Sequence, residues 1–124
     1  YAYLLLPDGG DLFEVHRATW QLNSPMLVIK GKPGEASLIR LRPSNLILEA
    51  VKVSEDYSKA LVIRVSEITN SRGPGELELP FKPSEAYETN LIETTKSSEG
   101  IEVTGNTVKF RYGNKQVKSI VVRL

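Results

Sequence analysis

The sequence contains no cysteine among its 124 residues. This absence excludes disulfides, thiolate nucleophiles and zinc sites with cysteine ligands. It also fits a cytoplasmic protein of bacterial or archaeal origin, since disulfides are rare in the cytosol. We take that compartment as the expected location.

Histidine is almost as scarce, because His16 is the only one in the chain. Any mechanism that needs two imidazoles is therefore excluded, and a Ser-His-Asp triad would have to centre on this residue. The G-x-S-x-G turn that carries the nucleophile of many hydrolases does not occur. We interpret His16 as a surface or partly buried residue, and we expect this chain to hold neither a catalytic residue nor a metal ligand set.

Net charge and long apolar runs are lacking too. Sixteen basic residues balance fifteen acidic ones to a formal charge of +1, which leaves no strong field to attract nucleic acid or an anionic membrane. Runs such as LVI and SIVV are far shorter than the ~20 residues of a membrane-spanning helix. We expect a soluble protein, with the basic residues near its end on a solvated strand face (Lys109, Arg111, Lys115 and Lys118).

The sequence begins with Tyr1, and its only methionine is Met26. We therefore expect a piece cut from a longer protein. The length suits one domain with one hydrophobic core, so we predict a single domain over residues 1–124.

Alternation of apolar and polar residues is the clearest local pattern. In IEVTGNTVKFRY it continues on both sides of Gly105-Asn106, a pair suited to a two-residue turn, so we predict a hairpin over residues 101–112. Similar patterns predict strands at residues 2–6, 26–30, 37–42, 46–53, 60–68, 76–79, 86–92 and 117–124.

Turn-forming residues separate these strands, among them PDGG, GKPG and the GPG at residues 73–75. Short strands at such spacing predict an all-β fold, an antiparallel β-sandwich of about eight or nine strands. One short helix is expected near residues 11–18, because Asp11 and Glu14 have capping-box spacing. We expect it to pass into an extended segment before Asn23.

A charged cluster lies in VKVSEDYSKALVIRVSE and consists of Lys52, Glu55, Asp56, Arg64 and Glu67. Arg64 and Glu67 fall on opposite faces of one strand, so they cannot pair with each other. A retaining glycosidase needs two carboxylates facing each other about 5 Å apart, which neighbours on a turn do not provide. We interpret the cluster as charges that brace the hairpin or an interdomain contact.

The order of six motifs resembles the C-terminal β region of glycoside hydrolase family 38, the zinc-dependent α-mannosidases. These motifs are YAYLLLPDGGD, NSPM, SNLILEAVKVSED, ALVIRVSE, NLIE and VKFRYGNKQVKSIVVRL. The charged cluster stands at the family's charged positions. Departures are Asp8 where the family often has histidine, Ser66 where an aromatic is common, and Ser119 where threonine is usual.

The resemblance implies a parent enzyme that hydrolyses terminal α-mannosides with retention. Its catalytic aspartate and zinc would lie in an amino-terminal domain, so this segment would hold no cofactor. The implied partners are that catalytic domain and, through it, a mannoside or oligosaccharide, and a homo-oligomer stays open. Structural or interdomain candidates are Asp8 and the charged cluster.

Two other functions stay open at this stage. A carbohydrate-binding module would use exposed rings as a platform for a sugar, and Trp20 and Tyr57 are the candidates. An immunoglobulin-like interaction domain would instead associate with itself or with another protein.

Overall fold

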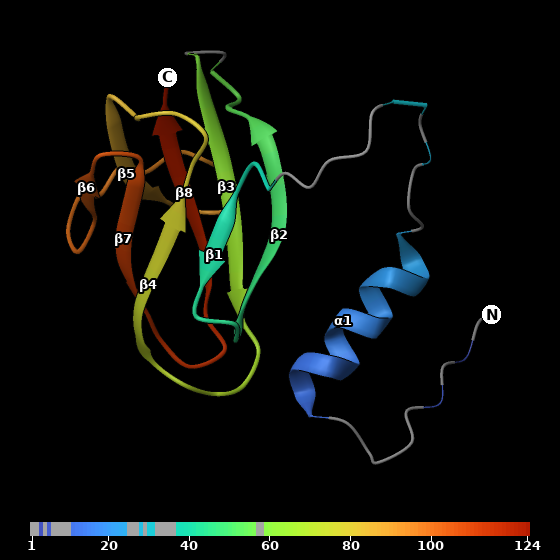
Figure 1. Ribbon diagram of the computed structural model, residues 1–124. Coiled ribbons are helices and arrows are strands. Elements are labelled where there is room, and N and C mark those ends of the chain that lie inside the picture. Colours follow the sequence, from blue (N-terminus) through green and yellow to red (C-terminus); the bar gives the residue numbers. More distant parts are fainter. Residues whose placement is uncertain are drawn as a thin grey trace. The chain divides into compact units, whose positions relative to one another are not determined.

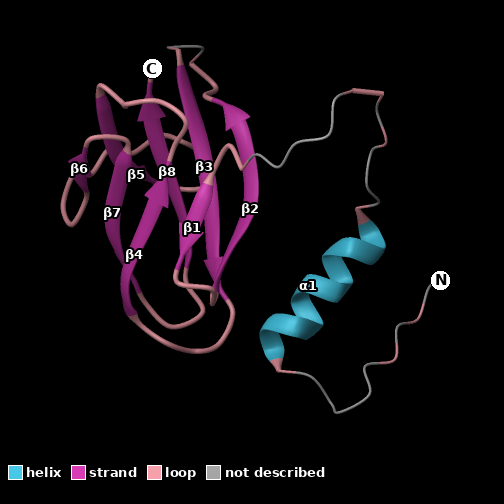
Figure 2. Ribbon diagram, viewed as in Figure 1, coloured by secondary structure: helices cyan, strands magenta, loops and turns pink. Residues whose placement is uncertain are grey.

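The computed structural model describes residues 3, 5, 11–24, 28, 30–31, 37–56 and 59–124. The chain divides into two compact units, Tyr1–Ala36 and Ser37–Leu124 (Figure 1). Among the described residues, the helix belongs to the first unit and the strands to the second (Figure 2). The strands predicted at residues 2–6 and 26–30 fall largely outside the described residues, and the candidates Asp8 and Tyr57 fall wholly outside them.

Helix α1 (Leu12–Asn23) begins at the predicted cap, where Asp11 Oδ1 accepts a hydrogen bond from the Glu14 N–H at 2.8 Å. The prediction that it ends near residue 18 and becomes extended is wrong. No glycine or proline interrupts the chain between Leu12 and Ser24. Pro25 then disfavours the helical conformation of the residue before it, Ser24. Thus α1 continues to Asn23, and none of its side chains is buried.

The described residues of the second unit form an antiparallel β-sandwich of eight strands, which confirms the predicted fold class. One sheet has the order β1-β4-β7-β6 and the other β2-β3-β8-β5 (Figure 1). The strands are β1 (Arg40–Arg42), β2 (Leu46–Val53), β3 (Ala60–Glu67), β4 (Gly73–Glu78), β5 (Glu85–Thr89), β6 (Glu102–Thr104), β7 (Thr107–Tyr112) and β8 (Val117–Arg123). We call the sheet β1-β4-β7-β6 sheet A and the sheet β2-β3-β8-β5 sheet B.

The main core contains apolar side chains of both sheets. Ile63 of β3 and Ile120 of β8 pack in it with Leu77 of β4 and Phe110 of β7. On its other face β3 buries Val62, which clusters with Tyr87 and other residues of sheet B. Strand β3 pairs with β2 and β8 and is buried on both faces, as expected for a central strand.

The β6–β7 hairpin is confirmed, with Gly105 at φ 62° and Thr104 opposite Thr107. In contrast, the prediction of a turn at residues 73–75 is wrong, because these residues begin β4. Pro74 is tolerated because β1 pairs only with residues 76–78, so β4 has β7 on one side at Pro74 and no paired strand on the other.

The basic residues near the end do not share one solvated face, which corrects that prediction. Lys109 and Arg111 are exposed on β7, but Lys118 of β8 is only 8% exposed. Lys118 donates to the carboxylate of Glu88 on β5. Because β8 is an inner strand of sheet B, its lysine needs this carboxylate to compensate for burial.

Candidate functional site

Lys52 connects the β2–β3 hairpin to a distant part of the chain. Its Nζ atom lies 2.6 Å from Glu93 Oε1 and also donates to the Glu55 carboxylate. Glu93 accepts a second hydrogen bond from the Glu55 backbone N–H at 2.9 Å. These contacts raise the pKa of Lys52, first through Glu55 and then through Glu93, and the hydrogen bond from Lys52 lowers the pKa of Glu93.

Glu93 belongs to the loop after β5, and we call residues 90–97 of this loop the strap. The strap contacts sheet B at several strands: Glu93 reaches Lys52 on β2, and the Nζ of Lys96 lies 4.6 Å from the centre of the Tyr87 ring on β5. Ser97 then pairs with Glu88 in an antiparallel bridge. These contacts therefore hold the strap against sheet B.

Arg64 fixes the strap to the middle of sheet B. Its Nη2 donates to the Leu91 carbonyl at 3.2 Å, and its Nε donates to Ser119 Oγ at 3.3 Å. The second contact is to β8, the strand beside β3, so one guanidinium joins two strands and the strap. Arginine suits this position because its planar group carries several donors in fixed directions.

Glu67 accepts hydrogen bonds from three loops and is only 3% exposed. Its Oε1 accepts from Asn45 Nδ2 at 3.0 Å and from the Thr69 N–H at 2.7 Å. Its Oε2 accepts from the Asn70 N–H at 2.9 Å and from the Lys115 N–H at 2.8 Å. One carboxylate thus ties together the β1–β2, β3–β4 and β7–β8 connections.

The ionised form of Glu67 is stabilised by these donors. Burial alone would raise the pKa of this carboxyl, but hydrogen bonds from Thr69, Asn45 and the Lys115 backbone lower it well below its usual value of 4.5. A glycosidase acid needs the opposite shift, because it must carry a proton near neutral pH. Glu67 and Glu93 are both held in the ionised state, which suits structural anions.

The charged cluster is therefore spread over separate sites. Arg64 and Glu67 have different partners, as their placement on opposite faces of β3 predicts. Asp56 accepts from Ser54 Oγ at 2.8 Å within the hairpin turn. Sequence patterns did not reveal Glu93 or the Lys118–Glu88 pair, because the contacting residues are far apart in sequence and leave no local pattern.

Trp20 and His16 lie on α1, where they line a hollow of ≈ 260 Å³ together with Thr19, Asn23 and Ser24. Trp20 is 39% exposed, so its ring is accessible in this unit. The Nδ1 atom of His16 is buried without a hydrogen-bond partner among the described residues.

The carboxylates and the histidine of the described residues do not gather around one point. No group of three or more histidine, aspartate or glutamate side chains in this part of the chain could hold a metal ion. The described residues therefore do not fit the zinc that the resemblance assigns to the catalytic domain of a parent enzyme.

The strand order and the internally paired charges define this unit as an antiparallel β-sandwich domain. The family described as "Glycosyl hydrolases family 38 C-terminal beta sandwich domain" matches residues 45–120. The chain belongs to this family. Searches of curated proteins and of solved structures gave no match. Among the described residues, no helix is long and apolar enough to cross a membrane.

Proposed function

We propose that this chain is the C-terminal β-sandwich of a zinc-dependent, retaining α-mannosidase and that it supports the catalytic domain without hydrolysing a glycoside itself. The family match over residues 45–120 is the observation that carries this proposal. The zinc and the nucleophile would lie in the catalytic domain of the parent enzyme, which would act on terminal α-mannosides.

The supporting role agrees with the way the charged residues are used. Lys52, Arg64 and Glu67 each contact groups of the same unit, so they hold loops and strands in place. The raised pKa of Lys52 and the lowered pKa of Glu67 favour the charged forms of these two side chains, whereas catalytic acids and bases exchange protons near the working pH.

The division of labour can be tested by assaying the 124-residue chain and the full-length parent on an aryl α-mannoside with zinc or cobalt. We expect turnover by the parent and none above background by the chain alone. Turnover by the purified chain, lost after chelation of the metal, would refute the proposal.

The supporting role needs a separate test. Removing the segment from the parent should lower the thermal unfolding midpoint of the remaining enzyme, and adding the chain back should raise it. An enzyme that keeps both its midpoint and its kcat without the segment would contradict a supporting role.

A further inference from the structure

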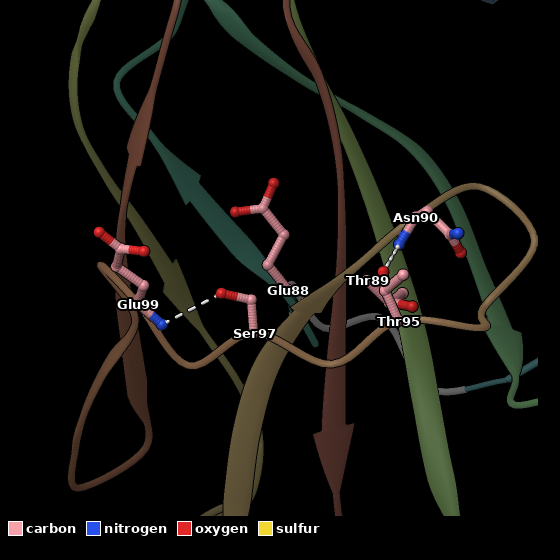
Figure 3. A pocket seen from close by; sticks show the side chains of 6 residues that line it. All are labelled: Glu88, Thr89, Asn90, Thr95, Ser97 and Glu99. Carbon is pink, nitrogen blue, oxygen red and sulfur yellow. Dashed lines mark hydrogen bonds between the residues drawn. The ribbon is translucent and has the colours of Figure 1, made fainter.

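The second unit has two hollows of similar size, and one of them is explained by the strap. This hollow, of ≈ 530 Å³, lies where the strap returns beside β5. Its groups bond to one another, since the Asn90 N–H donates to Thr95 Oγ1 and the Glu99 N–H donates to Ser97 Oγ (Figure 3). The other hollow, of ≈ 490 Å³, lies at the edge of sheet A.

The hollow in sheet A lies where the sheet is incomplete. Strand β1 ends at Arg42 and pairs only with residues 76–78, so residues 73–75 of β4 have β7 on one side and no paired strand on the other. We call the hollow the β4 notch, and it is lined by residues 42–44, residues 72–74, Glu76 and Tyr112. An open strand edge can pair with an extended peptide.

Positive charge without a close counter-ion gathers around the β4 notch. Arg72 is exposed and forms no ion pair among the described residues. Arg42 lies 3.8 Å from Glu78 Oε2, near the limit of an ion pair, and its side chain is 61% exposed. Arg111, opposite Pro74 on β7, is exposed as well. This end of sheet A is therefore complementary to an anionic partner.

Tyr112 adds a hydrogen-bond donor inside the β4 notch. A Cβ atom at Gly73 would lie 3.4 Å from Tyr112 Oη, and the same oxygen accepts from Asn45 Nδ2 at 3.3 Å. The hydroxyl group thus lies between the start of β4 and the connection that follows β1. Tyr112 is only 8% exposed, and no described residue accepts the hydroxyl proton, so this donor is left for a ligand.

The lining favours a carboxylate on a peptide over other anions. Guanidinium groups and a phenol donate charge-assisted hydrogen bonds to a carboxylate. The rings of Pro43 and Pro74 offer apolar surface to the rest of a peptide. A polyanion such as nucleic acid fits less well, because it would meet the Glu76 carboxylate beside the arginines and because the chain has a formal charge of only +1.

We propose that the β4 notch binds an extended acidic segment of a partner protein. A carboxylate of this segment accepts from Arg72, Arg42 and the Tyr112 hydroxyl, and its backbone lies beside residues 73–75, where β1 leaves β4 unpaired. This interaction surface goes beyond the supporting role and does not depend on it, because peptide binding can be measured on this chain alone.

The test uses the full 124-residue chain and a capped pentapeptide with glutamate at its centre and valine and threonine on either side. Backbone amide signals in ¹H–¹⁵N NMR spectra report where the peptide binds. We expect saturable shifts at Ser44, Arg72 and Gly73, with a Kd of about 0.1–1 mM for a short peptide on an open surface. The same peptide with glutamine at its centre should bind at least about fivefold more weakly, because it lacks the charge.

Inorganic phosphate distinguishes a peptide site from a general anion site. The proposal predicts that the glutamate peptide shifts these amides at concentrations at which phosphate does not. Shifts caused by phosphate and not by the peptide would overturn it, as would equal affinities for the glutamate and glutamine peptides or the absence of saturable shifts.

Two variants test the charge and the space of the β4 notch separately. Arg72→Gln removes the charge of an exposed side chain, and Gly73→Ala places a methyl group in contact with the Tyr112 hydroxyl, so each should weaken binding of the glutamate peptide about threefold to tenfold. Arg40→Gln is the matched control, because Arg40 lies on β1 outside the notch, and it should leave the affinity within about twofold. Equal affinities of Arg72→Gln and Arg40→Gln for the peptide would contradict the proposal.

Discussion

At the scale of single residues, Glu67 and Glu93 show two ways of keeping a carboxylate charged with little access to water. Glu67, 3% exposed, accepts hydrogen bonds from backbone N–H groups and from uncharged side-chain donors. Glu93, whose side chain is 6% exposed, pairs with Lys52 and with a backbone N–H. Both arrangements lower the pKa and bind parts of the chain together.

Replacing Glu67 by glutamine should destabilise the sandwich by about 3 kcal/mol, because an amide NH₂ would face a backbone N–H where the carboxylate accepts a hydrogen bond. Chemical denaturation of Glu67→Gln measures this loss. Glu102→Gln is the matched control, since Glu102 is exposed and accepts only a long 3.4 Å contact from Thr104. Equal stability of the two variants would show that the Glu67 contacts do not matter.

Glu67 also predicts how stability depends on pH. Its folded pKa lies below the usual value of 4.5, so its contribution is present in full above that value and is lost as the pH falls through the lowered pKa. Denaturation midpoints measured from pH 6 downward should therefore fall more steeply for the unchanged chain than for Glu67→Gln. Parallel pH profiles would contradict this assignment.

Glu93 should matter more than Glu55, although both contact Lys52. Glu93→Ala removes the acceptor of the Glu55 N–H and one partner of Lys52, so the Glu55 amide should exchange faster with deuterium and the unfolding midpoint should fall. Glu55→Ala keeps the Lys52–Glu93 pair, and the Glu55 side chain is 72% exposed, so its effect should be small. Hydrogen exchange measured by NMR tests this prediction. An exchange rate of the Glu55 amide that is the same in Glu93→Ala as in the unchanged chain would show that Glu93 does not hold the strap.

At the scale of elements, local sequence patterns predicted most of the strands. They failed where a residue distant in sequence determines the backbone conformation. Strands β2, β3, β7 and β8 show alternation or apolar runs that the sequence makes visible. The start of β4 was missed because Gly73, Pro74 and Gly75 are ordinary turn residues. Their strand conformation depends on the Phe110 ring and on the short length of β1, neither of which a local pattern contains.

Gly75 is needed in β4 because its missing side chain makes room for the core. A Cβ atom there would lie 2.6 Å from Phe110 Cζ and 3.0 Å from Leu46 Cδ1. Gly75→Ala should therefore destabilise the sandwich by about 1–3 kcal/mol, measured by denaturation. In the double variant Gly75→Ala with Phe110→Leu, the smaller side chain at residue 110 should relieve the clash, so the loss of stability should be less than the sum of the two single losses. A loss equal to that sum would argue against the clash.

At the scale of the whole molecule, the buried apolar residues of the described chain all belong to the second unit. They run from Leu46 to Val122, whereas α1 has no buried side chain. A chain that starts at residue 37 should therefore unfold cooperatively with a midpoint close to that of the full chain. A large fall in the midpoint would show that the first unit contributes to the stability of the sandwich.

The candidate site could be predicted only in part. The sequence placed Arg64 and Glu67 on opposite faces and favoured a structural role for the charged cluster, and the structure gives each of them partners within the sandwich. It could not reveal Glu93 as the partner of Lys52, because the geometry of the strap brings these two residues together.

The central claim is that the charged residues of this domain hold the sandwich and its strap together and take no part in hydrolysis. The most direct measurement is kcat per folded molecule, with the thermal unfolding midpoint, of the full-length parent enzyme that carries Glu67→Gln. We predict a lower midpoint and a kcat within about twofold of the unchanged enzyme at temperatures where both are folded. An unchanged midpoint with a kcat lower by about 100-fold or more, the size of a lost general acid or base, would contradict the claim.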